Sequence, residues 1–280
     1  MTAVGADNSI HAVLREARAQ LGNNFSAALD ARLLLQEATG LTHAEIIAEP
    51  ETEIGAESLV KFKSFIARRM AHEPVSRILG RREFYGRNFI VTPDVLDPRP
   101  DTEVVVELAL KLVSRGRFID LGTGSGAIAV TNAAENQNLS GIASDVSPAA
   151  LAVAQINAKA NAVEQRLAFQ RSHWFEGIEG KFDLIISNPP YIRANDKLMP
   201  EVFEYDPHLA LFGGEDGLEA YRAISAGASS HLASGGIVVV EIGSGQNEEV
   251  AKLFETEGLM LLDKATDLQD HIRALAFRRS

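Results

Sequence analysis

Apolar residues recur at helical spacing through the first quarter of the chain, and this pattern predicts four helices packed as a small bundle. Gly22 stops the first helix, Ser26 can cap the second, and Thr42 opens a capping box before the third. The fourth runs from about Glu57 to Ala71, before Pro74. The expected interior positions are Ile10, Val13, Leu14, Ala17, Leu21, Leu29, Leu33, Leu34, Ile46, Ile47, Leu59, Phe62, Ile66 and Met70.

After Pro74 the hydrophobic period shortens. Residues 76–92 alternate around Gly86, which predicts a β-hairpin, or two short strands, connecting two domains. From residue 96 onward, short apolar segments alternate with helical ones, as in a parallel sheet with helices on both faces. The predicted strands are 117–121, 141–144, 167–170, 182–187, 236–242, 259–263 and 272–277, the last two as an antiparallel edge. A long polar insertion, 192–207, follows the fourth of these strands.

Composition narrows the class of protein. The 280 residues are 46% apolar and 23% charged, which is typical of a soluble globular protein. The formal net charge of -11 argues against binding free nucleic acid by bulk electrostatics. The absence of cysteine excludes disulfides, thiolate nucleophiles and cysteine-ligated zinc, and the seven histidines lack ligand spacing. We therefore expect no metal site.

The chain carries no apolar run long enough to span a bilayer, so no membrane association is expected. Its first nine residues have neither the basic start nor the apolar core of a signal peptide. These observations favour a cytoplasmic protein.

A glycine-rich loop follows the first predicted strand of the sheet and opens a helix at Ala127. Its residues are Gly122, Thr123, Gly124, Ser125 and Gly126. A strand, a glycine loop and a helix N-terminus are typical of nucleotide binding, but alternate glycines differ from the G-x-G-x-x-G of pyrophosphate sites. The ligand therefore need not carry a phosphate, and a plain tight turn is the alternative.

Two further residues extend this candidate site. Asp145 ends the next strand about 20 residues further on, where related folds place the carboxylate that accepts ribose hydroxyls. A helix cap is the alternative role for Asp145. Trp174, the only tryptophan, follows the third strand and is interpreted as bordering an adenine pocket, with simple core packing as its alternative.

The fourth strand stops at Asn188, Pro189, Pro190 and Tyr191, at the sheet edge where open α/β folds bind ligands. The Asn188 side-chain oxygen and the Pro189 backbone carbonyl are acceptors on a rigid corner, able to hold both hydrogens of an –NH2 group. The Tyr191 ring can stack on a planar amide or base. Because no general base is apparent, such a nitrogen needs a very reactive electrophile, and a methyl sulfonium supplies one. Alignment of the nitrogen, the methyl group and the sulfur in one line, in a site short of water, would then account for most of the rate enhancement.

The stretches 120–129 (Asp-Leu-Gly-Thr-Gly-Ser-Gly-Ala-Ile-Ala) and 187–192 (Ser-Asn-Pro-Pro-Tyr-Ile) together resemble S-adenosylmethionine-dependent methyltransferases of amino nitrogens. Asn-Pro-Pro-Tyr is shared with adenine-N6 DNA methyltransferases. The segment 98–103 (Pro-Arg-Pro-Asp-Thr-Glu), the helical N-terminal region and the order of motifs narrow the resemblance to the peptide chain release factor glutamine N5-methyltransferases. The similarity covers essentially the whole chain.

This resemblance implies a Rossmann-like class I methyltransferase sheet of seven strands, mostly parallel, with an antiparallel edge. It implies three parts: a helical substrate-recognition domain (1–75), a hairpin connector (76–95) and a catalytic domain (96–280). The expected activity is methyl transfer from S-adenosylmethionine to the glutamine of the Gly-Gly-Gln motif in class I release factors, with the helical domain as docking surface. We expect a monomer that does not contact nucleic acid directly.

By the same resemblance, Gly122, Thr123, Gly124, Ser125, Gly126, Asp145, Trp174 and Asn188 bind the cofactor, and Asn188, Pro189, Pro190 and Tyr191 bind the substrate amide. Asn188, Pro189 and Tyr191 are the expected catalytic residues. Asp97 departs from the family, which usually has an aliphatic residue there. An adenine-N6 DNA methyltransferase of the same fold and a non-enzymatic cofactor-binding module are the alternatives.

Overall fold

The computed structural model describes residues 7–22 and 26–279, so part of the segment tested for a signal peptide lies outside it. The chain divides into two compact units, residues 1–80 and 81–280. The hairpin predicted as a connector belongs to the second unit. Among the described residues, no helix has the length and apolar character needed to cross a membrane.

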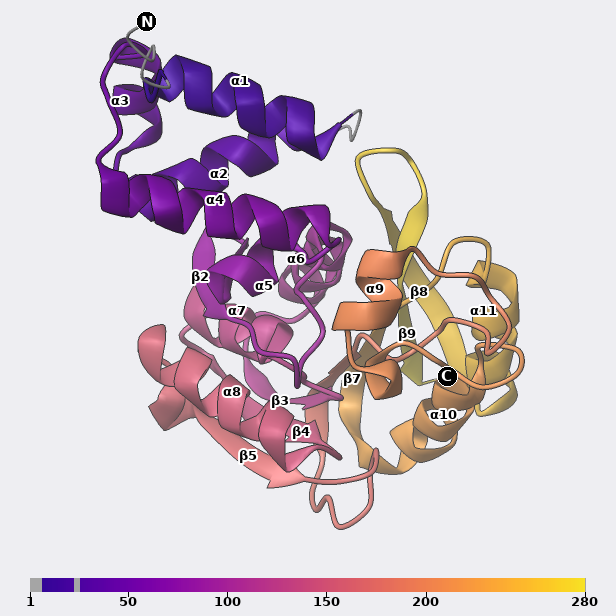
Figure 1. Cartoon of the computed structure of the whole chain (residues 1–280). Coiled ribbons are helices and arrows are strands. Elements are labelled where there is room, and N and C mark those ends of the chain that lie inside the picture. The colour runs from indigo at the N-terminus through magenta and orange to yellow at the C-terminus, as the bar shows by residue number, and fades with distance from the viewer. Residues whose placement is uncertain (1–6, 23–25, 280) are drawn as a thin grey trace, which may run out of the picture. The chain divides into compact units, whose positions relative to one another are not determined.

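The first unit is helical (Figure 1). Its helices are α1 (Ile10–Leu21), α2 (Ala27–Thr39), α3 (His43–Ala48), α4 (Ala56–Met70) and α5 (Val75–Leu79). Leu34, Leu35 and Phe62 are at most 2% exposed at its centre. A buried ion pair joins α2 to α4, with Arg69 Nε 2.8 Å from Asp30 Oδ2. The unit therefore has a hydrophobic core and a specific polar contact of its own.

Three details of this unit differ from the sequence prediction. Leu29, Ile47 and Met70 are about half exposed or more rather than interior, because the apolar stripe of each helix is narrower than the pattern suggested. Helix α5 occupies 75–79, where alternation was expected to begin. Ser26 precedes α2 as predicted, but its hydroxyl donates to the Asp30 carboxylate at 2.9 Å instead of accepting a backbone N–H.

The second unit begins with the hairpin of β1 (Arg81–Phe84) and β2 (Arg87–Ile90). Tyr85 and Gly86 form its two-residue turn, both with positive φ, as a type I′ turn requires. The Glu103 carboxylate accepts the Tyr85 N–H at 2.7 Å, which compensates in part for placing a non-glycine residue in this conformation.

A seven-stranded sheet forms the centre of the second unit, in the order β5-β4-β3-β6-β7-β9-β8. Its strands are β3 (Gly116–Leu121), β4 (Leu139–Asp145), β5 (Leu167–Arg171), β6 (Phe182–Ser187), β7 (Leu232–Glu241), β8 (Leu259–Thr266) and β9 (Ile272–Arg279). The first five are parallel, and β9 pairs antiparallel with both β7 and β8. The predicted class I methyltransferase sheet with an antiparallel edge is confirmed.

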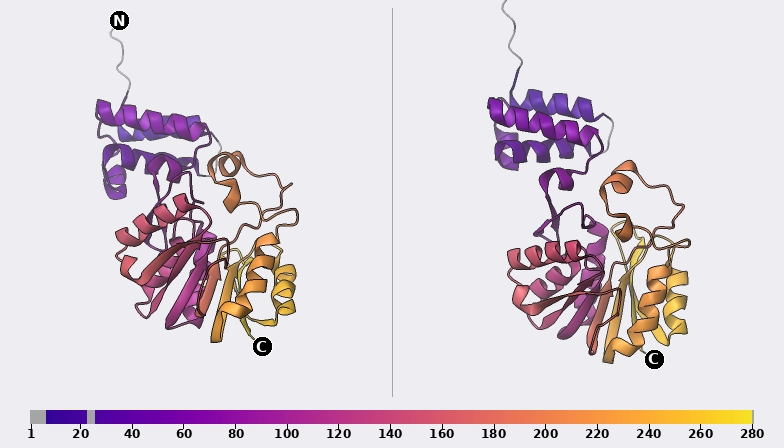
Figure 2. Two further views of the ribbon diagram at one scale, coloured as in Figure 1. Left: turned by 90° about the horizontal axis from the view of Figure 1, so that it is seen from below. Right: turned by 60° about the horizontal axis from the view of Figure 1, so that its bottom comes forward.

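Helices cover both faces of this sheet (Figure 2). Successive residues of β7 show why: Val239 packs in the core on one face, and Val238 and Val240 pack in the core on the other. The first face is covered by α6 (Glu103–Leu112), α7 (Ala127–Glu135) and α8 (Pro148–Ala160), and the second by α10 (Glu219–His231) and α11 (Asn247–Thr256). The short elements are η1 (Pro100–Thr102), η2 (Glu164–Arg166), α9 (Pro200–Tyr205) and η3 (His208–Ala210).

The order in which the chain adds strands to the sheet changes direction at β3. The chain passes from β3 to β4 and β5 on one side, and then returns to β6 on the other. At such a reversal the connecting loops diverge and leave a crevice at the carboxyl ends of the strands. The glycine loop follows β3, Asn188 follows β6, and Asp145 is the last residue of β4, so all three lie at this edge.

Candidate functional site

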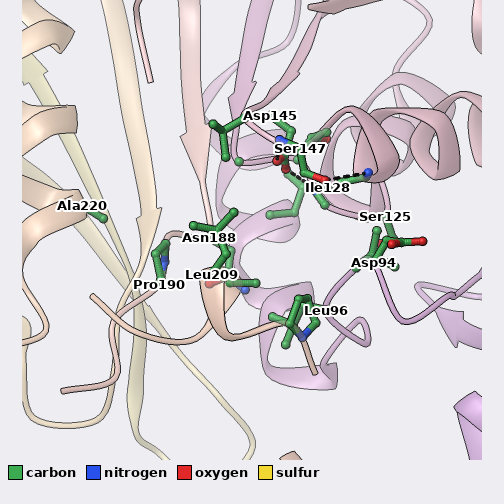
Figure 3. A pocket seen from close by; sticks show the side chains of 18 of the residues that line it. Asp94, Leu96, Ser125, Ile128, Asp145, Ser147, Asn188, Pro190, Leu209 and Ala220 are labelled. Atoms are coloured by element: carbon green, nitrogen blue, oxygen red, sulfur yellow. Dashed lines mark hydrogen bonds between the residues drawn. The ribbon is translucent and has the colours of Figure 1, made fainter. Parts of the chain in front are cut away.

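A cavity of about 630 Å³ lies at this edge of the sheet, within the second unit. The glycine loop, the ends of β4 and β6, residues 93–99 and the segment from Pro207 to Gly213 line it. Figure 3 shows Asp145, Ser147 and Ile128 together in one part of the cavity, and Asn188 beside Pro190 and Leu209 in another. The site thus has a nucleotide-type end and an amide-bearing end.

The glycine loop is held by backbone and side-chain hydrogen bonds. The N–H groups of Gly122 and Thr123 both donate to the Ser144 carbonyl at 2.9 Å, and the Thr123 hydroxyl donates to Asp120 Oδ2 at 2.6 Å. Gly124 has φ +54°, and a Cβ there would point into open space beside the cavity. A ligand can therefore approach the backbone closely at this point.

Asp145 connects the loop to the start of α8. Its Oδ2 accepts the Gly124 N–H and its Oδ1 accepts the Ser147 N–H, each at 2.9 Å. Since each carboxylate oxygen has two acceptor positions, both oxygens keep one for a diol. The Ser147 hydroxyl accepts the Ala150 N–H and caps α8 itself, so Asp145 is not needed as a cap.

Asn157, fully buried on α8, is a supporting residue that sequence reasoning missed. Its Oδ1 accepts the Ile90 N–H at 2.7 Å, and its Nδ2 donates to the carbonyls of Ile90 and Ser125 at 3.0 and 2.9 Å. One side chain thereby ties the hairpin to the glycine loop. Polar residues inside an otherwise apolar helix are the signal that could have identified it.

The amide-bearing end is built on the last residues of β6. The Ser187 hydroxyl donates to the Leu121 carbonyl at 2.7 Å, which locks β6 against β3 where both strands end. Asn188 then projects into the cavity, and its Nδ2 donates to Thr102 Oγ1 at 3.1 Å. Among the described residues, Asn188 Oδ1 has no hydrogen-bond partner. The amide oxygen is therefore available to a ligand.

Tyr191 is less exposed to the cavity than predicted. Its hydroxyl donates to Glu241 Oε1 at 3.4 Å, and its carbonyl accepts the Gln246 side-chain N–H at 3.2 Å. Burial and the neighbouring Glu241 raise the pKa of this phenol above its usual value. Tyr191 thus remains a neutral hydrogen-bond donor, and stacking of its ring on a substrate stays a prediction.

Two glycines allow a second loop to pack against the Asn-Pro-Pro-Tyr segment. A Cβ on Gly213 would lie 2.5 Å from the Pro190 carbonyl oxygen, and one on Gly217 would lie 2.4 Å from the Tyr191 carbonyl oxygen. Neither position tolerates a side chain without backbone movement. Arg99 Nη2 lies 2.7 Å from Asp206 Oδ2, which joins residues 98–103 to the end of the insertion.

Two fully buried carboxyl groups lie beneath the site. Burial raises the pKa of Asp120 to about 7, while the hydrogen bond from Thr123 acts in the opposite direction. Burial likewise raises the pKa of Glu241 to about 7, against hydrogen bonding from Thr102 and the nearby charge of Arg273. Glu241 ends β7, and a carboxylate in the apolar run Val238-Val239-Val240 was a signal that sequence reasoning passed over.

The predicted site residues fall into two groups. Those that line the cavity are Gly122, Thr123, Gly124, Ser125, Asp145, Trp174, Asn188 and Pro190. Gly126, Pro189 and Tyr191 are not among the lining residues. Gly126 lies against α8, where a Cβ would be 3.0 Å from the Ala154 Cβ, and Pro189 is buried. Asp97, noted for its unusual character, is buried and lines the cavity.

Similarity to known proteins agrees with this architecture. Residues 12–80 match the family model of the PrmC N-terminal domain, and residues 98–205 match that of the methyltransferase small domain. A release factor glutamine methyltransferase of Agrobacterium fabrum is 42% identical over 286 residues, covering 98% of this chain and 99% of that protein. The chain belongs to the release factor glutamine methyltransferase family. A second member, from Cereibacter sphaeroides, is 46% identical over 254 residues, with 90% of this chain and 91% of that protein covered.

Solved structures are similar at the level of the fold. A methyltransferase from Pyrococcus furiosus superimposes with a TM-score of 0.54 at 20% identity, covering 75% of this chain and 95% of that one. Because its sequence identity is this low, the comparison supports only the methyltransferase fold.

Proposed function

We propose that this protein transfers a methyl group from S-adenosylmethionine to the side-chain amide nitrogen of the glutamine in the Gly-Gly-Gln motif of class I release factors. The observation that carries the proposal is the free Asn188 Oδ1, held at the switch point of the sheet in the same cavity as the glycine loop and Asp145. Full-length similarity to release factor glutamine methyltransferases supports the choice of substrate.

The residues of the nucleotide-type end fit the cofactor. The open backbone at Gly124 accommodates a group in close contact, and Asp145 retains one acceptor position on each oxygen for the ribose hydroxyls. Trp174 provides an aromatic wall beside Gly122, whose Cβ position would lie 3.9 Å from the indole. When bound, S-adenosylmethionine supplies an electrophilic methyl group on a sulfonium.

At the other end, Asn188 Oδ1 and the Pro189 carbonyl accept the two hydrogens of the glutamine –NH2. Holding both hydrogens directs the nitrogen lone pair and limits rotation of the amide, which lowers the entropic part of the barrier. An amide nitrogen gains acidity as it forms its new bond, so water can remove the proton afterwards. The chain therefore needs acceptors rather than a strong base at this position.

The release factor is the proposed macromolecular partner, and the helical first unit is its proposed docking surface. The match of residues 12–80 to a dedicated N-terminal family model supports a specific role for this unit. A monomer working in the cytoplasm is consistent with this function and stays a prediction.

Incubation with methyl-labelled S-adenosylmethionine and either a class I release factor or duplex DNA tests the proposal. The expected result is labelling of the release factor alone, and loss of labelling when its Gly-Gly-Gln glutamine is replaced by alanine. Labelling of DNA without labelling of the factor would identify an adenine methyltransferase instead.

A further inference from the structure

The backbone of Trp174 adopts a conformation that a large aromatic residue rarely takes. Its φ is +53°, in the left-handed region, where the Cβ of an L-residue lies too close to the following carbonyl oxygen. Among the described residues, Trp174 is the only non-glycine residue with positive φ that lines the cavity. A strained residue of this kind persists only where its surroundings hold it, and such residues gather at functional sites.

This conformation brings the indole close to the glycine loop. The Cβ position of Gly122 lies 3.9 Å from Trp174 Cζ3, and the indole also packs at the margin of the core beside α10. The ring therefore forms a wall at the end of the cavity that also contains Asp145. A wall made by a single ring contributes most to affinity when its orientation is fixed before the ligand binds.

Ser172, two residues before Trp174, holds this turn from the inside. It is 7% exposed, and its hydroxyl lies 2.8 Å from the Trp174 carbonyl oxygen and 2.7 Å from the Glu176 carbonyl oxygen. Because a hydroxyl has one proton to donate, the two carbonyls share it. Both carbonyls are thus drawn toward Ser172, and the chain between them forms a tight turn.

The backbone of Ser172 joins this turn to the residue proposed to bind the ribose. Its N–H donates to the Asp145 carbonyl at 3.0 Å, one residue beyond the last paired position of β4 and β5, where Asp145 lies opposite Arg171. The Asp145 side chain in turn accepts the Gly124 N–H. Ser172 therefore connects the Trp174 turn to the glycine loop through a single intermediate residue.

Phe175 fixes the other side of the turn, against α10. Its ring stacks on the His231 ring, with centroids 4.4 Å apart and planes 14° apart. Gly227, on the same helix, leaves the space that the Phe175 ring occupies. Trp174 is held between these two anchors, which together offset the cost of its left-handed backbone.

We propose that Ser172 is a positioning residue for S-adenosylmethionine, which holds Trp174 in its left-handed conformation and keeps this aromatic wall in a fixed place relative to Asp145. The inference rests on the proposed binding of this cofactor. It adds that the adenine wall and the ribose acceptor form one unit, organised by a serine whose hydroxyl bonds to the turn itself.

The protein contains one tryptophan, so its intrinsic fluorescence reports on this wall alone. In the wild type, the anisotropy of Trp174 should decay with the rotation of the whole protein. In Ser172→Ala the turn loses its central hydrogen bond, and a fast component from local motion of the ring should appear. The dissociation constant for S-adenosylmethionine, measured by calorimetry, should rise about 10-fold, within the range for leaving buried carbonyls without a partner.

Ser225→Ala is the matched control. Ser225 is also buried, on α10, and its hydroxyl likewise donates to a backbone carbonyl, that of Arg222, but it does not line the cavity. This variant should keep the wild-type anisotropy decay and affinity. If circular dichroism shows that Ser172→Ala does not fold, Phe175→Leu, which removes the other anchor, should show the same two changes and decides instead.

The proposal is overturned if either the anisotropy decay or the dissociation constant of the deciding variant matches the wild type. Equal changes in Ser225→Ala would also overturn it, because they would show a general loss of stability. Failure of the wild type to bind S-adenosylmethionine would instead reject the proposed function itself.

Discussion

Asp145 accepts two backbone N–H groups, one on each carboxylate oxygen. The hydrogen bonds to Gly124 and Ser147 fix the direction of the carboxylate. A preorganised acceptor loses little side-chain entropy on binding. Its contribution should therefore appear almost entirely in cofactor affinity.

Asp145→Asn should weaken S-adenosylmethionine binding about 10- to 100-fold, because a charged acceptor becomes a neutral one with a single acceptor oxygen. Calorimetric titration measures this directly. Asp263→Asn, which removes a surface carboxylate paired with Lys111, is the control and should bind the cofactor normally. Unchanged affinity in Asp145→Asn would contradict the ribose role.

The least predictable residues were those that contact the site from distant positions in the sequence. Thr102 directly precedes α6 in the sequence, and nothing local indicates that its hydroxyl meets Asn188 in the folded chain. Glu241 ends a buried strand, and only the fold brings it to Tyr191. The motif residues themselves were recognisable because glycines, prolines and a terminal aspartate have strong local conformational preferences.

At the scale of elements, the junction between α7 and α8 depends on one glycine. Gly126 has φ +82° and stands before the first turn of α7, against Ala154 of α8. Its predicted contact with the cofactor stays a prediction, while its Cβ position faces Ala154 rather than the cavity. The close approach of these helices keeps the loop at residues 122–125 in place.

Gly126→Ala should lower the free energy of unfolding by about 2–4 kcal/mol, the sum of a left-handed backbone cost and the crowding of Ala154. Urea denaturation monitored by circular dichroism measures the change. Gly235→Ala serves as the control, since Gly235 has φ +76° but no atom within 4 Å of its Cβ position. That variant should lose only the backbone part, about 1–2 kcal/mol. Equal losses in the two variants would show that helix packing is not involved.

The positions of most strands and helices could be predicted from the spacing of hydrophobic residues along the chain. Buried parallel strands carry continuous apolar runs, and the seven predicted strands correspond to β3 to β9 with small shifts at their ends. The insertion 192–207 was predicted only as polar, yet it contains α9 and exposes Met199 and Phe203, and η3 with the exposed Leu209 follows it directly. Helices this short have too few turns to establish a period.

At the scale of the whole molecule, buried carboxyl groups make stability depend on pH. The pKa of Glu241 rises from its ordinary value of 4.5 to about 7 on folding. Between these values the folded state binds more protons than the unfolded state, so this group lowers stability as pH rises.

Glu241→Gln removes that titration. The free energy of unfolding of the variant, relative to wild type, should therefore increase by about 3 kcal/mol from pH 4.5 to pH 7, at about 1.4 kcal/mol for each pKa unit. Urea denaturation of both proteins at several pH values measures the difference. A difference that does not change with pH would show that Glu241 titrates normally in the folded protein.

The central claim is that Asn188 holds a glutamine amide of a release factor for methyl transfer. Mass spectrometry of a class I release factor, after incubation with S-adenosylmethionine and either the wild type or Asn188→Ala, tests it most directly. We predict one added methyl group on the side-chain nitrogen of the Gly-Gly-Gln glutamine with the wild type. With Asn188→Ala we predict a rate lower by about 10²–10³, as for removal of one polar group that orients a reacting atom. A methyl group elsewhere, or an equal rate with Asn188→Ala, would contradict the account.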